Sequence, residues 1–353
     1  MRGLSYRQKL KIKKYGLLIL SVMIITTVFM SIPSMARALP DSLADILTTG
    51  SKAEYNISHQ EERLTAIMGD SFSAVLGYDY EIEPEIPKTD NIEGAKYVKA
   101  VNLCWYSYED NPKLHLLNRT DFKVDLNDYK NLEFPIRNTI DSAPVVLIVH
   151  THGTESYLEE GKDYYTAGET FRSEDITKNV VAVGEVLVEE LINRGINTVH
   201  DKTMQDKDSF SNSYSNSKRA VAEYLLRYPS IKYVVDIHRD AVFTSDGVNQ
   251  KPVTSINNNQ VAQVMLVVGT NQGGANHPDW KKNLTVAVNL QDIMNQDYPT
   301  LARPLCLRTA SFNQQLSPGY LLLEIGSCGN TIEEAKNAAK LFATSMAEMI
   351  YSK

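Results

Sequence analysis

Cysteine is scarce in this chain of 353 residues, which has only three: Cys104, Cys306 and Cys328. None stands in a CxxC or CxxxC pair, and this excludes a disulfide scaffold and a zinc ribbon built from cysteine. Repeats and low-complexity tracts are absent as well. Hydrophobic residues make up 43% and charged residues 22%, so the chain has enough apolar material for a sizeable core in one or two domains.

Basic residues are few outside the first 14 positions. Those positions hold six Lys or Arg and no acid, which leaves 30 basic against 43 acidic side chains in the rest, a formal charge of −13. Proteins bind nucleic acid largely by neutralising its phosphates, and so acidic a body is poorly suited to that task. We therefore expect no nucleic-acid partner.

Charge is missing altogether from residues 16–36, a run long and apolar enough to cross a membrane. Basic residues precede this run, and the positive-inside rule places them in the cytoplasm. We predict a cytoplasmic basic tail over 1–15, a retained single-pass transmembrane anchor over 16–36 and an extracytoplasmic body. The alternative is a cleaved signal peptide with an AxA site at Ala36-Arg37-Ala38, but the apolar run exceeds the usual ~7–15 residues and favours the anchor.

The pattern of polar and apolar residues divides the exported part into a linker and a folded domain. Residues 37–95 are polar with little periodicity and predict an extracytoplasmic linker, whereas 96–353 predict a folded domain with a lead-in over 96–143. We expect strands at 145–149, 196–199, 231–237, 261–268 and 320–325, and helices at 176–194, 213–227, 279–296 and 331–351. This alternation predicts a three-layer α/β fold, with a mostly parallel sheet flanked by helices.

Polar residues end three of the expected strands. The first strand leads into His152 and Glu155 in an HxxE step. The second leads into His238, and Glu324 lies near the end of the third. Sites in open α/β sheets lie at the carboxyl ends of strands, and a catalytic zinc takes three protein ligands, commonly two His and one carboxylate. The sequence therefore predicts a Zn²⁺ site of His152, Glu155 and His238, with Glu324 as general base.

Two ligand assignments stay open. His150 stands two residues before His152, so in extended backbone both side chains point to the same face and either can be the ligand. The other histidine then supports the site or contacts substrate. Glu174, just before an expected helix, is the alternative carboxylate ligand, although the helix dipole also accounts for an acid at that place.

The neighbours of His238 complete the predicted site. Asp236 and Asp240 share the strand face of His238, and a metal-bound histidine is commonly oriented by such a carboxylate. Arg239 points to the other face. There it either contacts a carboxylate or carbonyl of the substrate or forms a salt bridge at the strand end.

Three segments carry a family resemblance: VLIVHTHGTESY (146–157), VVDIHRDA (234–241) and LLLEIGSCGNTIEEA (321–335). Together with the lead-in LNRTDFKVDL (117–126) and the basic, apolar N-terminus, they resemble the signatures of the stage II sporulation protein P family. The resemblance covers roughly residues 115–350, and the motifs in combination are far more specific than any one alone.

The resemblance implies the fold and zinc chemistry of N-acetylmuramoyl-L-alanine amidases, with 96–353 as the catalytic domain. The implied reaction is hydrolysis of the amide between the lactyl group of muramic acid and the first L-alanine of the stem peptide. Endopeptidase activity on peptide cross-links is implied as an addition. The implied role is peptidoglycan removal at the cell membrane during forespore engulfment, together with a lytic transglycosylase and a multi-spanning membrane protein.

Two other functions stay open. A zinc carboxypeptidase-like exopeptidase uses the same ligand types and needs a basic pocket for a terminal carboxylate, for which Arg239 or Arg308 is available. A non-catalytic peptidoglycan tether is the second, although a tether has no need of a general base such as Glu324. The products separate the three functions: whole stem peptides, single amino acids or none.

Overall fold

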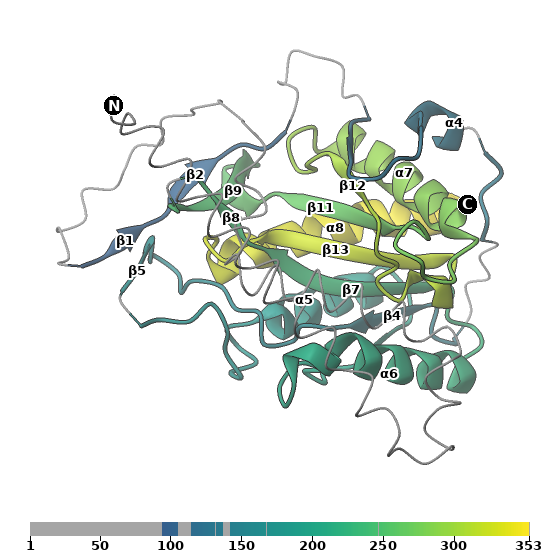
Figure 1. Ribbon diagram of the computed structural model, residues 1–353, viewed down its shortest axis with the longest axis horizontal. Coiled ribbons are helices and arrows are strands. Elements are labelled where there is room, and N and C mark those ends of the chain that lie inside the picture. The colour runs from purple at the N-terminus through teal and green to yellow at the C-terminus, as the bar shows by residue number, and fades with distance from the viewer. Residues whose placement is uncertain are drawn as a thin grey trace, which may run out of the picture. The chain divides into compact units, whose positions relative to one another are not determined.

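Seven strands form one sheet in the part of the chain that the computed structural model describes, residues 94–104, 114–130, 132–136, 142–166, 168–245 and 247–352. Their order across the sheet is β3 (Leu116–Asn118), β12 (Leu305–Arg308), β11 (Val264–Gly269), β13 (Gly319–Ser327), β7 (Tyr233–Asp240), β4 (Val146–Val149) and β6 (Thr198–His200). Figure 1 shows β11, β13, β7 and β4 side by side, with β13 from near the C-terminus in the middle.

Strand direction changes once across this sheet. Five of the six neighbouring pairs are parallel, whereas β11 and β13 are antiparallel. The predicted α/β sheet flanked by helices is therefore confirmed, with one antiparallel junction that the sequence does not indicate. A continuous apolar run marks a buried strand without showing which way it runs.

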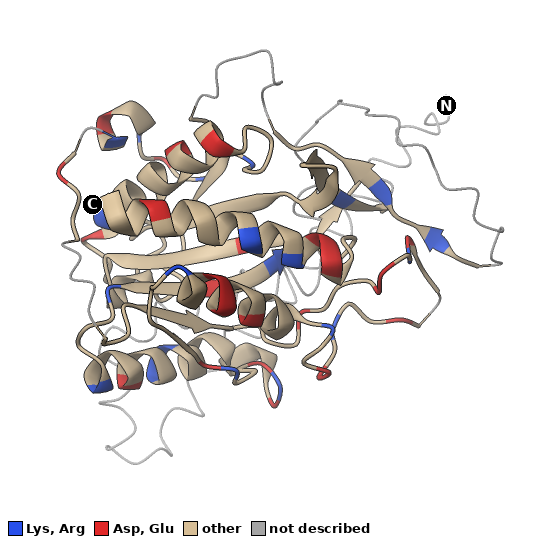
Figure 2. Cartoon of the chain, turned by 180° about the vertical axis from the view of Figure 1, so that it is seen from behind, with Lys and Arg blue, Asp and Glu red and all other residues tan. Residues whose placement is uncertain are grey.

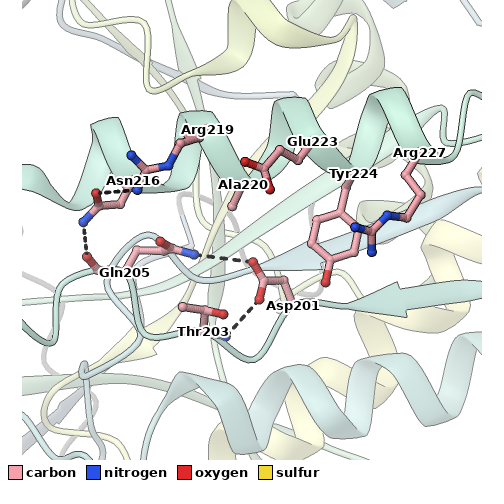
Figure 3. Close-up of a pocket in the computed structure, with 9 residues that line it drawn as sticks. All are labelled: Asp201, Thr203, Gln205, Asn216, Arg219, Ala220, Glu223, Tyr224 and Arg227. Atoms are coloured by element: carbon pink, nitrogen blue, oxygen red, sulfur yellow. Dashed lines mark hydrogen bonds between the residues drawn. The ribbon is translucent and has the colours of Figure 1, made fainter.

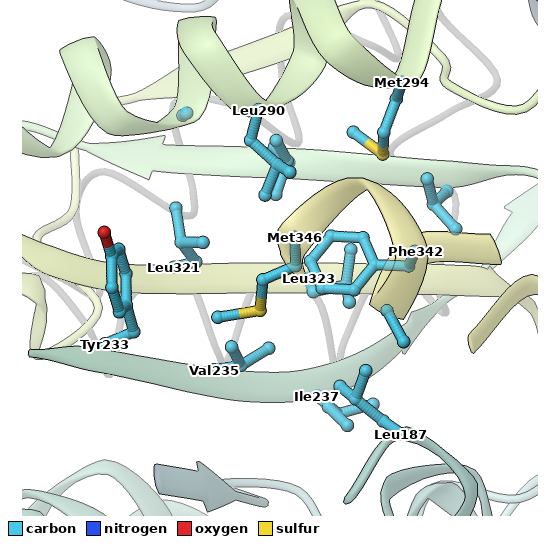
Figure 4. Packing of buried hydrophobic residues seen from close by; sticks show 14 of the residues in the cluster. Leu187, Tyr233, Val235, Ile237, Leu290, Met294, Leu321, Leu323, Phe342 and Met346 are labelled. Carbon is cyan, nitrogen blue, oxygen red and sulfur yellow. The ribbon is translucent and has the colours of Figure 1, made fainter. Parts of the chain in front are cut away.

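Helices cover both faces of the sheet. Helices α5 (Val180–Asn193), α7 (Trp280–Asp297) and α8 (Ile332–Ser352) bury Leu187, Leu290 and Phe342 against Ile237 and Leu323 (Figure 4). On the other face, α6 (Ser213–Arg227) places Val221 in a second cluster of buried residues, the others being Leu147, Val149, Ile231, Val234 and Tyr320. From behind, Figure 2 shows α8 crossing the sheet, with acidic and basic positions interspersed along the helix.

Local sequence signals explain several helix boundaries. Helix α6 covers the predicted 213–227. At α8 the capping box forms as expected: Thr331 N donates to Glu334 Oε2 at 3.1 Å, and Glu334 N donates to Thr331 Oγ1 at 3.3 Å. Helix α5 ends before Gly195, whose φ of +79° is a conformation that favours glycine.

The predicted strand over 261–268 is wrong in one respect, because two strands share that range. β10 (Asn259–Ala262) ends before Gln263, and β11 begins after it. The buried side-chain amide of Gln263 accepts from Leu103 N at 2.7 Å and donates to the Thr300 carbonyl at 2.8 Å. A buried amide must be hydrogen-bonded, and the hydrogen bonds of Gln263 lie at the break between β10 and β11. The apolar pattern of residues 261–268 alone does not reveal this break.

Smaller elements surround the sheet. β9 (Asn249–Ile256) pairs with β10, β2 (Lys99–Val101) and β8 (Val242–Phe243), while β1 (Lys96–Tyr97) pairs with β5 (Tyr164–Tyr165). The helices α4 (Leu126–Lys130), η3 (Phe210–Asn212) and η4 (Gln314–Leu316) are short. The lead-in is thus part of the same fold, because β3 is an edge strand of the main sheet.

The predicted tail (1–15), anchor (16–36) and most of the linker (37–95) lie outside the described residues and remain predictions. No helix within the described ranges combines the length and hydropathy needed to cross a membrane.

Candidate functional site

The carboxyl ends of three adjacent strands bring the predicted residues together. Glu324 of β13 and His238 of β7 are register partners. β4 lies on the other side of β7, with Val149 paired to Asp236, so the turn after β4 carries His152 and Glu155 toward His238. The ring centroids of His152 and His238 are 5.3 Å apart, and Glu155 Oε2 is 3.6 Å from His238 Nδ1.

These side chains are buried, which sets their protonation. His152 and Glu155 are each 7% exposed and His238 is 3% exposed. Burial lowers the pKa of His152 to about 3, so at neutral pH its imidazole is uncharged, the form that binds a metal. Burial opposes ionisation of Glu155 too, but the nearby charge of His238, 3.6 Å away, outweighs that and lowers the pKa of Glu155.

His238 lies between two carboxylates. Burial alone would lower its pKa, but Asp236 and Glu155 together raise that pKa well above its ordinary value. Asp236 Oδ1 is 3.3 Å from Nε2, whereas Glu155 Oε2 is near Nδ1. Nε2 makes no hydrogen bond within the described ranges, but the charge of Asp236 favours a proton there, and Nδ1, on the side of Glu155, is then the nitrogen available to a metal.

Asp236 is itself firmly held. It is fully buried and accepts from Thr151 N at 2.8 Å, from Thr151 Oγ1 at 2.6 Å and from the Tyr320 hydroxyl at 3.0 Å. A carboxylate with three such donors keeps its position and its charge, because the donors replace the water that burial removes.

Glu324 has the properties of a general base. Burial, with the nearby charge of Asp240, raises its pKa to about 8 against the opposing effects of His238 and Arg303. Its Oε2 is buried and makes no hydrogen bond to any described residue. A carboxylate whose pKa lies near neutrality can both take and return a proton.

A layer of residues behind His152 was not predicted. The His152 ring stacks on Phe210 with centroids 4.6 Å apart, and Arg172 covers Phe210 at 4.6 Å. Asp206 Oδ2 lies 3.9 Å from His152 Nδ1 and accepts from Arg172 Nη1 at 2.7 Å and from Thr154 Oγ1 at 2.6 Å. No strand-end motif marks the 201–212 loop. The pairing of β6 with β4 brings this loop to the site, and the contacts of Thr154 and Arg172 with Asp206 hold it there.

The two alternative ligands lie apart from this cluster. The prediction that His150 and His152 point to the same face is wrong, because β4 ends at Val149 and the chain turns. His150 Nε2 is instead 2.8 Å from His200 Nε2, and both rings press against Gly184 of α5. Glu174 is exposed and pairs with Lys207 at 2.8 Å.

Arg239 and Asp240 are engaged by other protein groups. The Arg239 guanidinium donates to the carbonyls of Phe171 at 2.6 Å and Ser156 at 3.2 Å, so it ties the turn after β4 to β7. Asp240 pairs with Arg303 at 2.7 Å. Neither contact points to an open pocket for a substrate carboxylate.

His152, Glu155 and His238 are residue types that bind zinc, and the one distance between two of their donor atoms is close to that in a zinc site. Two ligands of a tetrahedral zinc at ~2.1 Å are separated by about 3.4 Å, close to the 3.6 Å between Glu155 Oε2 and His238 Nδ1. His152 Nδ1 is buried, makes no hydrogen bond within the described ranges and faces Asp206 at 3.9 Å, which leaves Nε2 as the nitrogen for a metal. As the side chains lie, however, no group of three or more His, Cys, Asp or Glu among the described residues is arranged to hold a metal ion.

Comparison with known proteins gives one family. The model of the family described as stage II sporulation protein P matches residues 77–347. The stage II sporulation protein P of Bacillus subtilis (strain 168) is 30% identical over 232 residues, which cover 62% of this chain and 54% of that protein. The chain thus matches about half the length of this curated relative.

Three solved structures of amidases show a distant likeness. N-acetylmuramoyl-L-alanine amidase AmiC2 of Nostoc punctiforme has a TM-score of 0.32 and 13% identity, covering 59% of this chain and 96% of that one. N-acetylmuramoyl-L-alanine amidase from Clostridium difficile 630 has a TM-score of 0.33 and 15% identity, and the match covers 60% of this chain and 97% of that one. The CwlD amidase of Clostridioides difficile, solved in complex with the GerS lipoprotein, has a TM-score of 0.34 and 14% identity. This match covers 59% of this chain and 94% of that one.

Proposed function

This chain belongs to the stage II sporulation protein P family, and from that premise we propose that it is a peptidoglycan hydrolase of sporulation. The proposed reaction is zinc-dependent hydrolysis of the amide between N-acetylmuramic acid and L-alanine, with cross-link endopeptidase activity as an addition. One observation carries the proposal: two histidines and a carboxylate meet beside Glu324, which is the register partner of His238.

The proposed roles follow from the geometry. His152, Glu155 and His238 would hold the ion, with Asp236 orienting His238. When bound, zinc supplies a Lewis acid that polarises the scissile carbonyl. Glu324 takes a proton from the attacking water as its oxygen adds to the carbonyl carbon. Glu324 then gives that proton to the leaving amine of L-alanine as the C–N bond breaks.

The setting of the reaction is part of the same proposal. Residues 16–36 would anchor the chain in the cell membrane, with the catalytic domain outside the cytoplasm. Family membership supports a role in forespore engulfment, beside a lytic transglycosylase and a multi-spanning membrane protein. The acidic composition supports a partner other than nucleic acid.

The exopeptidase alternative has less support from the site. A terminal carboxylate needs a basic side chain free to receive it, and Arg239 donates to two backbone carbonyls. The tether alternative does not explain why a buried carboxyl, Glu324, with a pKa of about 8 lies beside His238.

Digestion of purified peptidoglycan tests the proposal. The full-length chain, kept soluble with a non-ionic detergent, is incubated with sacculi, and the products are identified by mass spectrometry. We expect intact stem peptides with a free N-terminal alanine, lost on chelation and restored by zinc. Release of single amino acids would favour the exopeptidase. Wall binding without any release would favour the tether.

A further inference from the structure

A groove lies between helix α6 and the segment 201–205 that follows β6 (Figure 3). Its volume is about 310 Å³, at the lower end of the ~300–1,000 Å³ typical of small-ligand sites. One stripe of the helix forms its upper wall: Asn216, Arg219, Ala220, Glu223, Tyr224 and Arg227. These positions recur every three or four residues, so they share one helix face.

Charges in the groove cancel. Asp201 and Glu223 bring two carboxylates, and Arg219 and Arg227 bring two guanidinium groups. A strongly anionic or cationic ligand would therefore meet as much repulsion as attraction. Most of the other lining residues carry amides or hydroxyls. An apolar ligand would leave these polar groups without hydrogen-bond partners. The lining suits a neutral ligand rich in hydroxyl and amide groups.

Several polar groups in the groove are available to such a ligand. The side chains of Glu223, Tyr224 and Arg227 make no hydrogen bond to other described residues, and Figure 3 shows them beside one another on α6. The Tyr224 ring is stacked on Tyr228 with centroids 6.5 Å apart, which steadies it as a flat platform. A sugar ring placed on an aromatic face can use its hydroxyls toward a carboxylate and a guanidinium at once.

The opposite wall of the groove is held in shape. Asn216 Nδ2 donates to the Gln205 carbonyl at 3.0 Å, which ties the helix to the segment below it. Thr203 N donates to Asp201 Oδ1 at 3.1 Å. A groove whose walls are joined by hydrogen bonds is formed before any ligand arrives, so binding costs little ordering.

Two residues that contact the proposed catalytic site lie next to the groove in the sequence. Gln205 lines the groove, and the next residue, Asp206, contacts His152. Tyr214, half a turn before Asn216 on α6, packs edge-on against the same His152 ring at 5.5 Å between centroids. This proximity makes the groove a candidate site for a part of the substrate that lies away from the bond that is cut.

We propose that this groove binds a neutral N-acetylated amino sugar of the glycan strand whose peptide is cut at His152, Glu155 and His238. The assignment of this sugar to a peptidoglycan strand rests on the proposed function. The groove would place the strand so that a neighbouring muramoyl amide reaches Glu324. Its effect would be on KM for long substrates, because the groove lies outside the reacting atoms.

Sugar binding is measured directly with N,N′-diacetylchitobiose, by calorimetry on the full-length chain in detergent. Tyr224→Ala removes the platform, and Leu226→Ala is the matched control, since Leu226 is 82% exposed on the same helix outside the groove. We expect wild type and Leu226→Ala to bind the sugar alike and Tyr224→Ala to bind at least ~10-fold more weakly. KM for long glycan strands should rise about as much in Tyr224→Ala, with kcat unchanged.

The outcomes separate the groove from the reaction. The proposal that the groove binds the sugar is overturned if wild type does not bind the sugar. It is also overturned if Tyr224→Ala binds the sugar as well as wild type does. Binding of inorganic phosphate in preference to the sugar also overturns it, because that would show an anion site. Sugar binding lost in Tyr224→Ala, in a chain that releases no stem peptides, would support the groove while the proposed reaction fails.

Discussion

Asp206→Asn tests whether the layer behind His152 prepares that histidine for zinc. The substitution keeps the size of the side chain and removes its charge. In the native chain Asp206 is 1% exposed at its side chain, and Oδ2 accepts from Arg172 Nη1 and Thr154 Oγ1. An asparagine oxygen in the place of Oδ2 can keep both contacts, but its amide nitrogen then faces Thr154 N, which donates to Oδ1 at 3.1 Å in the native chain.

Two magnitudes follow from these contacts. Hydrogen bonds to a charged group contribute ~1.5–3 kcal/mol, but Arg172 is 38% exposed and solvent screens its share, so we expect a stability loss of about 1–2 kcal/mol. Carboxylates behind a metal-bound histidine affect metal affinity ~10–100-fold. Asp206→Asn should therefore weaken zinc binding by that factor, equivalent to about 1.4–2.8 kcal/mol.

Zinc affinity is measured by competition with a chromophoric chelator at a temperature where both proteins are folded. Asp208→Asn, an exposed carboxylate in the same loop, is the control and should match wild type. An affinity of Asp206→Asn within twofold of wild type would refute the idea that Asp206 prepares His152. A fall of equal size in Asp208→Asn would show only a general charge effect.

Four further predictions concern the same domain. His238→Ala should lose bound zinc and hydrolysis together, as measured by metal analysis and stem-peptide release. Glu324→Gln should keep zinc and lose at least ~100-fold in kcat, and near-normal turnover would exclude Glu324 as the base. Because burial raises the pKa of Glu324 to about 8 from an ordinary 4.5, the metal-free chain should lose stability as pH rises between those values. Thermal unfolding of Glu324→Gln should show less of this loss. Gly184→Ala should destabilise by about 1–3 kcal/mol in urea unfolding, against the usual gain in a helix, because a Cβ there would lie 2.7 Å from His150.

The sequence predicts the strand ends well because the signals there are local. An apolar run such as 231–237 marks a buried strand, and polar residues after it are conspicuous. That is why His238 and Glu324 could be assigned to strand ends from the sequence, although the pairing of their strands and their shared register could not. The run ends at Ile237, yet β7 continues to Asp240. Arg239 N donates to Glu155 Oε2 at 3.1 Å, a contact that depends on the distant turn.

What could not be predicted depends on contacts far apart in the sequence. Asp206 and Phe210 sit in a polar loop that carries no periodic signal, and they reach His152 only through the fold. His150 illustrates the same limit, since the two-residue spacing predicts a shared face only while the backbone stays extended. The turn after Val149 and the space left by Gly184 decide its position instead.

The central place of β13 has a consequence for how the domain assembles. This strand is the last of the sheet along the chain, yet it fills the gap between β7 and β11. Until it inserts, those two strands have open edges, so the sheet closes late and through contacts of long sequence separation, a slow kind of folding. Because Glu324 arrives on this same strand, a partly folded chain lacks its base. A hydrolase built this way would be inactive until its fold is complete.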